Sequence, residues 1–248
     1  MTDLADLATR LHEAATTRCA IPRLTDSVDL TVAQAYEVQR LLVEKRTADG
    51  EQLVGIKMGL TSQAKMAQMG VNEAIWGRLT SGMWIPDGGS MAADRFIHPR
   101  VEPEIAFRLD AHGIPTAVAP ALEIIDSRYA HFKFTLPDVI ADNTSAAAFT
   151  IGPWHPLPDT LDNLGVLLEI NGRVAETGST AAILGDPRRA LTAGLRMATA
   201  AGQHIHHGWV LLAGAATAAV PLTPGDHARA VVQELGSASL SLTDAARS

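Results

Sequence analysis

Three glutamates in the middle of the chain have a spacing that suits metal binding. Glu102 and Glu104 lie two residues apart in RVEPEIAF (100–107), so strand alternation would place both carboxylates on one face. Glu123 has apolar neighbours on both sides, where an unpaired charge is costly. Three carboxylates form a sound site for a hard cation such as Mg²⁺ or Mn²⁺. For the closely spaced pair alone, the alternative is a solvent-facing edge strand, which Pro103 would suit.

Lys57 is the second candidate for chemistry, because it interrupts an apolar run over 53–60. A buried lysine has a lowered pKa and can take part in acid–base catalysis. The alternative is a lysine at a strand end whose ammonium reaches solvent. Ser145 follows Asp142 and Asn143, and it could donate a hydrogen bond to a substrate carboxylate or simply close a turn.

Other chemical signals are weak or missing. His204, His206 and His207 have no carboxylate nearby in the sequence, so we expect a surface loop rather than a metal site. The sequence has no G-x-S-x-G elbow, no Walker loop and no G-x-G-x-x-G motif. These gaps remove support for a serine hydrolase, a P-loop NTPase and a Rossmann dehydrogenase.

Composition narrows the classes further. The 248 residues carry 20 Lys and Arg against 27 Asp and Glu, a net charge of −7, without a basic run that would favour nucleic acid. The single cysteine, Cys19, excludes a disulfide framework and fits a reducing compartment. We find no signal peptide and no apolar stretch of about 18 residues that would span a membrane. We therefore expect a cytoplasmic protein with neither nucleic acid nor membrane as a partner.

The elements that must position these side chains follow from periodicity and turn residues. Apolar spacing predicts helices over 3–18 and 31–49, the second with a Thr31–Gln34 capping box and Gly50 as its stop. Asn171 and Gly172 predict a hairpin. We expect strands over 53–61, 99–109, 122–125, 146–151, 166–170, 173–176, 209–213, 227–235 and 238–242, a connection over 113–120, and helices over 63–69, 137–142 and 187–201. This pattern predicts one α+β domain over 1–248, helical over 1–50 and β-rich over 51–248.

Five segments, in this order, resemble a known family. They are GIKMGLT (55–61), RVEPEIAF (100–107), PALEIIDSR (120–128), ADNTS (141–145) and PGD (224–226). Together they resemble the 2-keto-4-pentenoate hydratase / 4-oxalocrotonate decarboxylase family of the fumarylacetoacetate hydrolase superfamily. The resemblance runs from about the second helix to the C-terminus, and the ordered set is far more specific than any one segment.

The resemblance implies both a fold and a site. The implied fold is a mixed β-roll of the fumarylacetoacetate hydrolase C-terminal-domain type with N-terminal helices. The implied cofactor is Mg²⁺ or Mn²⁺, held by Glu102, Glu104 and Glu123. Lys57 matches the active-site lysine of the family, and Ser145 matches its substrate-side serine.

The reaction expected from this resemblance is loss of CO₂ from 2-oxo-3-hexenedioate (4-oxalocrotonate) or a close analogue, giving 2-hydroxypenta-2,4-dienoate. The metal would bind the C1 carboxylate and the 2-keto oxygen and stabilise the dienolate that forms. Lys57 would supply charge to the enolate oxygen or a proton to the product. The expected substrate contacts are Leu60, Thr61 and Ser145, with Met58, Ile75 and Trp76 as an apolar wall that removes water from the departing carboxylate.

Three observations favour the decarboxylase branch over the hydratases. The run 57–79 looks like the decarboxylases, and the connection between Glu104 and Glu123 is shorter than hydratases usually show. Gly82 also stands where many hydratases have Asp, and adding water needs a group that positions or activates it.

Two other reactions stay open, and the family implies partners. The reactions are hydration of the dienoate and C–C hydrolysis of an acylpyruvate, although no His lies beside the three carboxylates in sequence. A non-enzymatic role is disfavoured because all three ligands and Lys57 are present. We expect a homo-oligomer in aromatic meta-cleavage catabolism, with a possible complex with a paralogous hydratase.

Overall fold

The first fifty residues form the helices that their apolar spacing predicts. The computed structural model describes residues 3–62, 66–67, 70 and 73–244. Asp3 caps the first helix by accepting the backbone N–H of Ala5 at 2.9 Å. Thr31 and Gln34 form the predicted capping box, and Gly50 adopts a φ of 96° just after the second helix, as its role as a stop requires.

Strands dominate the rest of the chain. The helices are α1 (Leu4–Thr17), α2 (Val32–Ala48), α4 (Leu136–Ala141) and α5 (Pro187–Ala200). The strands are β1 (Leu53–Gly59), β2 (Ile75–Thr80), β3 (Ser90–Ala92), β4 (Arg100–Leu109), β5 (Pro115–Ile125), β6 (Ala146–Ile151), β7 (Gly165–Ile170), β8 (Arg173–Ser179), β9 (Val210–Ala215), β10 (Val220–Pro221), β11 (His227–Val232) and β12 (Gly236–Thr243).

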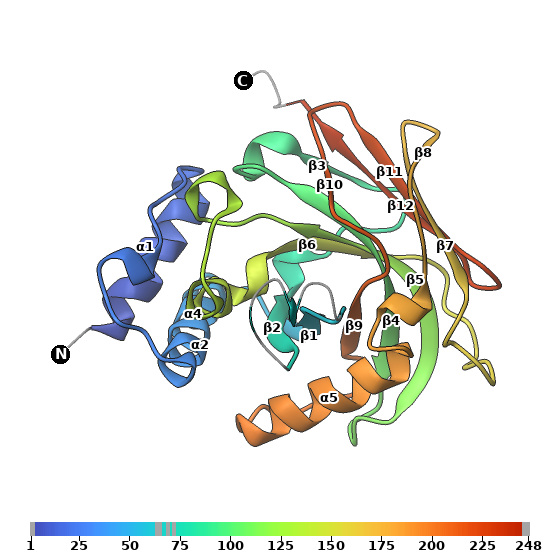
Figure 1. Cartoon of the computed structure of the whole chain (residues 1–248), viewed down its shortest axis with the longest axis horizontal. Helices are drawn as coiled ribbons and strands as arrows, with labels where there is room; N and C mark the ends of the chain where they lie inside the picture. Colours follow the sequence, from blue (N-terminus) through green and yellow to red (C-terminus); the bar gives the residue numbers. More distant parts are fainter. Residues whose placement is uncertain (1–2, 63–65, 68–69, 71–72, 245–248) are drawn as a thin grey trace.

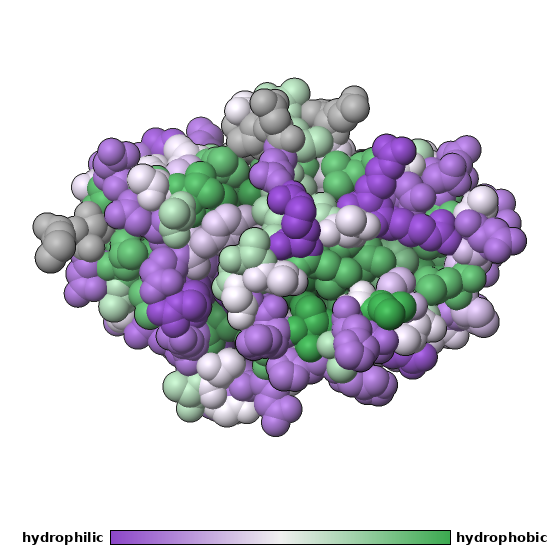
Figure 2. Space-filling model, turned by 90° about the horizontal axis from the view of Figure 1, so that it is seen from below, coloured by the Kyte–Doolittle hydropathy of each residue, from purple (hydrophilic) through white to green (hydrophobic). Residues whose placement is uncertain are grey.

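The described strands form two sheets. One has the order β2-β1-β9-β4-β5-β6, with β10 also paired to β4, and the other has the order β3-β12-β11-β7-β8. Helices α1, α2 and α4 gather on one side of the molecule, the second sheet lies on the opposite side, and α5 runs beneath (Figure 1). Seen from that lower side, hydrophobic patches are separated by hydrophilic side chains (Figure 2). No helix in the described ranges is long and apolar enough to cross a membrane.

The first sheet curls so that the segment after β2 reaches β6. The Ile85 N–H donates to the Phe149 carbonyl at 2.8 Å, and the Trp84 ring lies tilted against the Phe149 ring with their centroids 5.5 Å apart. The inner face of the curl buries Ala106, Ala121 and their neighbours in one apolar cluster. Because Ala121 pairs directly with Glu104, the glutamates share this inner face.

The outer face of the same sheet is covered by α5 and by the second sheet. A Cβ at Gly194 of α5 would lie 2.7 Å from the Met58 sulfur, so the helix packs directly on β1. Val101, Leu122 and Ile124 pack instead in a cluster with residues of β7, β11 and β12. Two layers thus enclose the strands that carry the glutamates, which keeps those strands away from solvent.

Two predictions about strands need correction. The connection predicted over 113–120 is wrong, because β5 begins at Pro115. Pro120 lacks a donor, yet its carbonyl still accepts the Gly152 N–H at 2.9 Å, so the chain stays paired there. The edge position considered for Pro103 is also wrong, since β4 lies between β5 and β9. The helix predicted over 63–69 lies mostly outside the described residues.

The other predicted elements are confirmed with small shifts at their ends. The hairpin turns at Asn171 and Gly172, whose φ angles of 53° and 72° suit a tight two-residue turn. The strand predicted over 227–235 ends at Val232, and the next strand begins at Gly236. The predicted α+β class, with helices first and strands later, matches the structure.

Candidate metal centre and active site

The three glutamates converge as the sequence predicts. Glu102 pairs directly with Glu123 across β4 and β5, and strand alternation puts Glu104 on the same face. Each offers a carboxylate oxygen, and these oxygens all lie within 4.8 Å of one another. The side chains are buried, with exposed fractions of 5% for Glu102, 1% for Glu104 and 0% for Glu123. Three acids this close and this buried need a compensating charge.

The electrostatics of the cluster also indicate that it needs a compensating positive charge. Burial raises the pKa of Glu104 well above its ordinary value, and the neighbouring Glu123 and Glu102 carboxylates raise it further. Burial also raises the pKa of Glu123, against the opposing effect of Lys57. Glu104 Oε1 and Glu123 Oε1 have no hydrogen-bond partner in the described part of the chain. Unsatisfied buried carboxylate oxygens in such a group fit a hard divalent cation.

Lys57 supplies one positive charge to this cluster. Its side chain is 3% exposed, and Nζ lies 3.0 Å from Glu123 Oε2. The ammonium also donates to the Thr144 carbonyl at 3.0 Å. The solvent-reaching alternative for Lys57 is therefore wrong. Counted over these four described side chains, three carboxylates and one ammonium give a net charge of about −2, which a divalent cation would neutralise.

The turn Asn143–Ser145 crosses the inner face next to Lys57. Asn143, Thr144 and Ser145 have φ angles of 50°, 54° and 57°, a left-handed conformation that is rare for three successive non-glycine residues. The Asn143 side chain holds β2 by accepting the Arg78 N–H and donating to the Arg78 carbonyl, both at 2.8 Å. Gly77 leaves room for this turn, since a Cβ there would lie 2.8 Å from the Asn143 carbonyl oxygen.

Ser145 ends this turn with its hydroxyl oxygen buried and without a hydrogen-bond partner among the described residues. Its backbone is held at both ends, because its N–H donates to Asp142 and its carbonyl accepts from Asp126, both at 2.9 Å. A fixed, unsatisfied hydroxyl in a buried site is suited to bind a ligand.

Gly214 positions Glu104. Its backbone N–H donates to Glu104 Oε2 at 2.8 Å, from a φ of 108° that strongly favours glycine. A Cβ at Gly214 would lie 2.1 Å from the Thr61 hydroxyl oxygen. Thr61 is buried, so the structure brings this predicted substrate residue beside a glutamate of the cluster. No sequence signal marked Gly214.

Replacing Gly214 by alanine should lower both stability and activity. We expect a loss of about 1–3 kcal/mol of unfolding free energy from the unfavourable φ and the clash with Thr61. The Gly214 N–H would then no longer be placed to donate to Glu104. Because this hydrogen bond orients the Glu104 carboxylate, kcat/KM should fall roughly tenfold or more. Gly202 is the matched control, because its φ is 73° and nothing lies within 4 Å of a Cβ there. Equal losses of activity in G214A and G202A would contradict this role.

The predicted apolar wall is only partly assembled. Ile75 pairs with Gly59 and lies with Thr144 on the inner face. Met58 and Trp76 pair with each other on the outer face, where Met58 contacts α5 and Trp76 stacks on Tyr36 of α2 at 5.9 Å. The structure therefore separates Met58 and Trp76 from Lys57 by the thickness of the sheet.

Leu60 directly follows β1 in a left-handed conformation, with a φ of 55°. It is half-buried against the cluster of α1, α2 and α4 side chains. The three histidines lie where the sequence places them, because His204, His206 and His207 are exposed in the loop before β9. Within the described residues, the carboxylate cluster contains no histidine.

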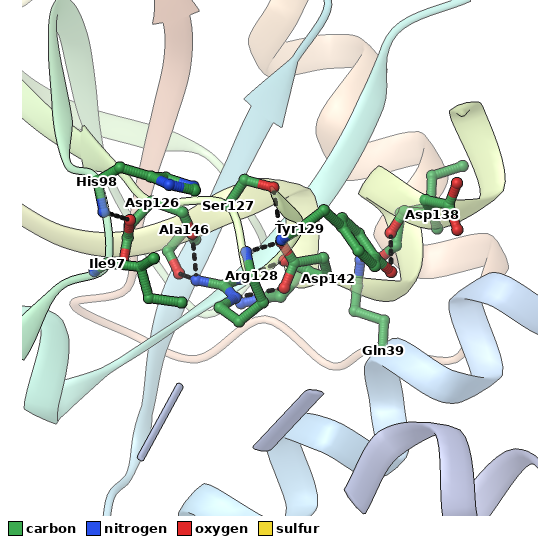
Figure 3. A network of polar contacts seen from close by, with 12 residues as sticks. Gln39, Ile97, His98, Asp126, Ser127, Arg128, Tyr129, Asp138, Asp142 and Ala146 are labelled. Carbon is green, nitrogen blue, oxygen red and sulfur yellow. Dashed lines mark hydrogen bonds and ion pairs between the residues drawn. The ribbon is translucent and has the colours of Figure 1, made fainter. Parts of the chain in front are cut away.

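A second buried ion pair, which the sequence did not predict, supports the turn from behind. The Arg128 guanidinium pairs with the Asp142 carboxylate and donates to the backbone carbonyls of Asp126 and Asp142 (Figure 3). Burial raises the pKa of Asp142 to about 6, although Arg128 opposes that rise. Removing either partner would leave the other charge buried and unpaired, which is costly.

Comparisons with known proteins agree with this picture. No protein-family model matches the chain. The chain is 51% identical to a 4-oxalocrotonate decarboxylase of Pseudomonas sp, over 97% of this chain and 98% of that protein. It is 32% identical to a 2-hydroxyhexa-2,4-dienoate hydratase of Comamonas testosteroni, over 95% and 96% of the two chains.

Solved structures give the same result. The 4-oxalocrotonate decarboxylase from Pseudomonas putida G7, complexed with magnesium and adipate, matches with a TM-score of 0.89 and 38% identity, over 96% of this chain and 97% of that one. The fumarylpyruvate hydrolase from Pseudomonas aeruginosa, in complex with Mn²⁺ and pyruvate, matches with a TM-score of 0.57 over 77% and 89% of the chains. At 12% identity, that second likeness shows the fold alone.

The curled sheets of this chain have the same fold as these two solved enzymes, and they enclose a buried cluster of three carboxylates. The chain belongs to the 2-keto-4-pentenoate hydratase / 4-oxalocrotonate decarboxylase family. The resemblance and the fold class expected from the sequence are thereby confirmed.

Proposed function

We propose that this protein catalyses metal-dependent decarboxylation of 4-oxalocrotonate, or a close analogue, to 2-hydroxypenta-2,4-dienoate. The observation that carries this proposal is the buried cluster of Glu102, Glu104 and Glu123 beside Lys57. The 51% identity to a 4-oxalocrotonate decarboxylase over nearly the whole chain supports the choice of reaction. The enzyme would be a carbon–carbon lyase.

The three glutamates would hold Mg²⁺ or Mn²⁺, since their buried oxygens are the donors that such cations prefer. When bound, the cation would supply a Lewis acid that takes up the negative charge developing on the 2-keto oxygen. Gly214 would keep Glu104 oriented for this task through its 2.8 Å hydrogen bond. In other metal sites, too, hydrogen bonds from groups behind the ligands fix the direction in which the ligands point.

Side chains of the protein would bind the substrate and supply the proton that the reaction needs. As the bond to the distal carboxylate breaks, CO₂ leaves and the electron pair moves through the conjugated chain to the 2-keto oxygen. Lys57 would stabilise this enolate oxygen and supply the one proton that completes the product. Ser145 would donate a hydrogen bond to a substrate carboxylate, and Thr61 and Leu60 would contact the substrate beside Glu104 and Ile75. We do not assign Met58 and Trp76 to this pocket, because they lie on the outer face.

Hydration of the dienoate is the second candidate, because hydratases of this family match 95% of the chain at 32% identity. The test supplies Mg²⁺ with 4-oxalocrotonate in one reaction and with 2-hydroxypenta-2,4-dienoate in the other. We expect CO₂ release in the first reaction and slow loss of dienoate absorbance in the second. Rapid loss of the dienoate without CO₂ from 4-oxalocrotonate would replace the decarboxylase proposal with the hydratase. Turnover of an acylpyruvate alone would favour C–C hydrolysis instead.

We further propose that the chain works in the cytoplasm as one catalytic domain, within a homo-oligomer that can associate with a paralogous hydratase. A paired hydratase would consume the reactive dienoate that decarboxylation releases. Size-exclusion chromatography with light scattering of the purified chain, alone and mixed with such a hydratase, measures both associations.

A further inference from the structure

A cavity of about 300 Å³ lies between α1, α2 and the start of β6, behind the Asn143–Ser145 turn. Neither Lys57 nor the three metal-binding glutamates line it. Asn143 and Ala146 form part of its wall, so the cavity and the catalytic cluster lie on either side of one short segment. Its volume is near the lower limit of small-molecule sites in proteins.

The walls of this cavity combine hydrocarbon with guanidinium groups. Leu11, Val43 and Phe96 are buried apolar side chains from α1, α2 and the segment before β4. Arg18 and Arg95 are exposed and also line the cavity. Apolar walls with a few polar groups at one side suit a ligand that has a hydrocarbon body and an anionic end.

The positive charge of these two arginines is not compensated. Arg18 donates to the backbone carbonyl of Asp94 at 3.1 Å, which is a neutral acceptor. Arg95 has no hydrogen bond or ion pair within the described ranges. Burial lowers the pKa of Arg46, which also lines the cavity, and the positive charges of Arg128 and Arg95 lower it further. Arg95 directly follows Asp94, whose carbonyl accepts from Arg18, and both arginines line the cavity.

The acidic side chains of the cavity are already engaged. Asp126 accepts the backbone N–H groups of Ile97 and His98, both at 2.8 Å. Glu51 lies 3.3 Å from Arg46 and balances that guanidinium. Asp49 is 69% exposed and lies 3.9 Å from His12. Arg46 and Arg128 each have a carboxylate partner, so Arg18 and Arg95 are the two arginines of the cavity wall without an ion pair in the described part of the chain.

We propose that this cavity is a second ligand site, which binds a small organic carboxylate and acts on turnover through the Asn143–Ser145 turn. The carboxylate end would pair with Arg95 and Arg18, and the hydrocarbon body would lie against Leu11 and Phe96. Because Asn143 both lines the cavity and holds the turn that accepts the Lys57 hydrogen bond, an occupant would change how firmly that turn is held.

Hexanoate is a suitable probe, with hexan-1-ol and sulfate as its uncharged and purely anionic counterparts. Calorimetric titration of metal-free wild-type protein should show hexanoate binding more tightly than either counterpart. R95Q should weaken hexanoate binding about tenfold, as expected for the loss of one charge-assisted contact. R173Q is the matched control, because Arg173 is exposed on β8 far from the cavity, and it should bind like wild type.

Activity supplies the second readout. Saturating hexanoate should change the kcat of the Mg²⁺-loaded wild-type and R173Q enzymes and leave the kcat of R95Q nearly constant. Equal hexanoate affinities in R95Q and wild type would overturn the proposal, as would equal binding of sulfate and hexanoate. Purely competitive inhibition that persists in R95Q would assign hexanoate to the catalytic site and overturn it too.

Discussion

Replacing Glu104 by glutamine will abolish metal-dependent turnover and leave a folded protein. The substitution keeps the shape of the side chain and removes one of the three negative charges that would hold the cation. The amide oxygen can still accept the Gly214 N–H, so the local backbone should persist. We expect kcat/KM to fall by about 10³-fold or more, because the charge that stabilises the transition state is lost with the metal.

The stability of the same variant should change in the opposite direction. Without metal, Glu104 is a buried carboxylate beside two others, and its neutral replacement removes that repulsion. Metal-free E104Q should therefore melt a few degrees above metal-free wild type, as a gain of about 1 kcal/mol implies for a chain of this size. Added Mg²⁺ should raise the Tm of wild type and have little effect on that of E104Q.

Calorimetric melting curves with EDTA and with Mg²⁺ measure both effects, and steady-state assays measure the loss of turnover. E13Q is the matched control, since Glu13 is exposed on α1 and has no part in the cluster. Wild-type activity in E104Q, or a lower metal-free Tm, would show that the cluster is not built to hold a cation.

The site illustrates which parts of this molecule the sequence predicts. Period-two alternation correctly placed Glu102 and Glu104 on one face, because that rule depends only on neighbouring residues. The direct pairing of Glu102 with Glu123 depends on the register of two strands joined by a loop, and only the structure shows it. The family resemblance predicted Glu123 as a metal ligand without any information about the strand register.

Strand alternation also shows that Met58 cannot belong to the apolar wall predicted beside Lys57. Met58 follows Lys57 directly in a strand, so the two side chains must point to opposite faces. Trp76 could not be placed from sequence alone, since its face depends on pairing with Met58. Ile75 pairs with Gly59 and therefore shares the face of Lys57.

The features of the site that the sequence did not predict depend on tertiary contacts. The left-handed turn at Asn143–Ser145 contains no glycine, so no residue type announces its conformation. The turn is held by Arg78 of β2 and by the Arg128–Asp142 pair, whose members are 14 residues apart. Glycine is needed at position 214 because Thr61 and Glu104 lie against it, and both are far from it in the sequence. These constraints are long-range, and local periodicity carries no information about them.

Replacing Lys57 by methionine should also remove activity, by a different route. A buried methionine fills similar space but offers neither charge nor proton, so kcat should fall by about 10²- to 10³-fold. Metal binding should become tighter rather than weaker, because the cluster loses the Lys57 ammonium beside Glu123 and becomes more negative by one charge. E104Q and K57M should thus shift Mg²⁺ affinity in opposite directions while both lose turnover.

The metal-free stability of K57M should reveal the same charge balance. Glu123 would lose the ammonium 3.0 Å away, so metal-free K57M should melt below wild type, and saturating Mg²⁺ should recover most of the difference. K133M is the control, since Lys133 is exposed between β5 and α4. If K57M bound Mg²⁺ more weakly than wild type, Lys57 would be holding the ligands in place rather than competing with the cation for their charge. The opposed Mg²⁺ affinities of the two variants therefore separate the lysine's chemical role from a purely structural one.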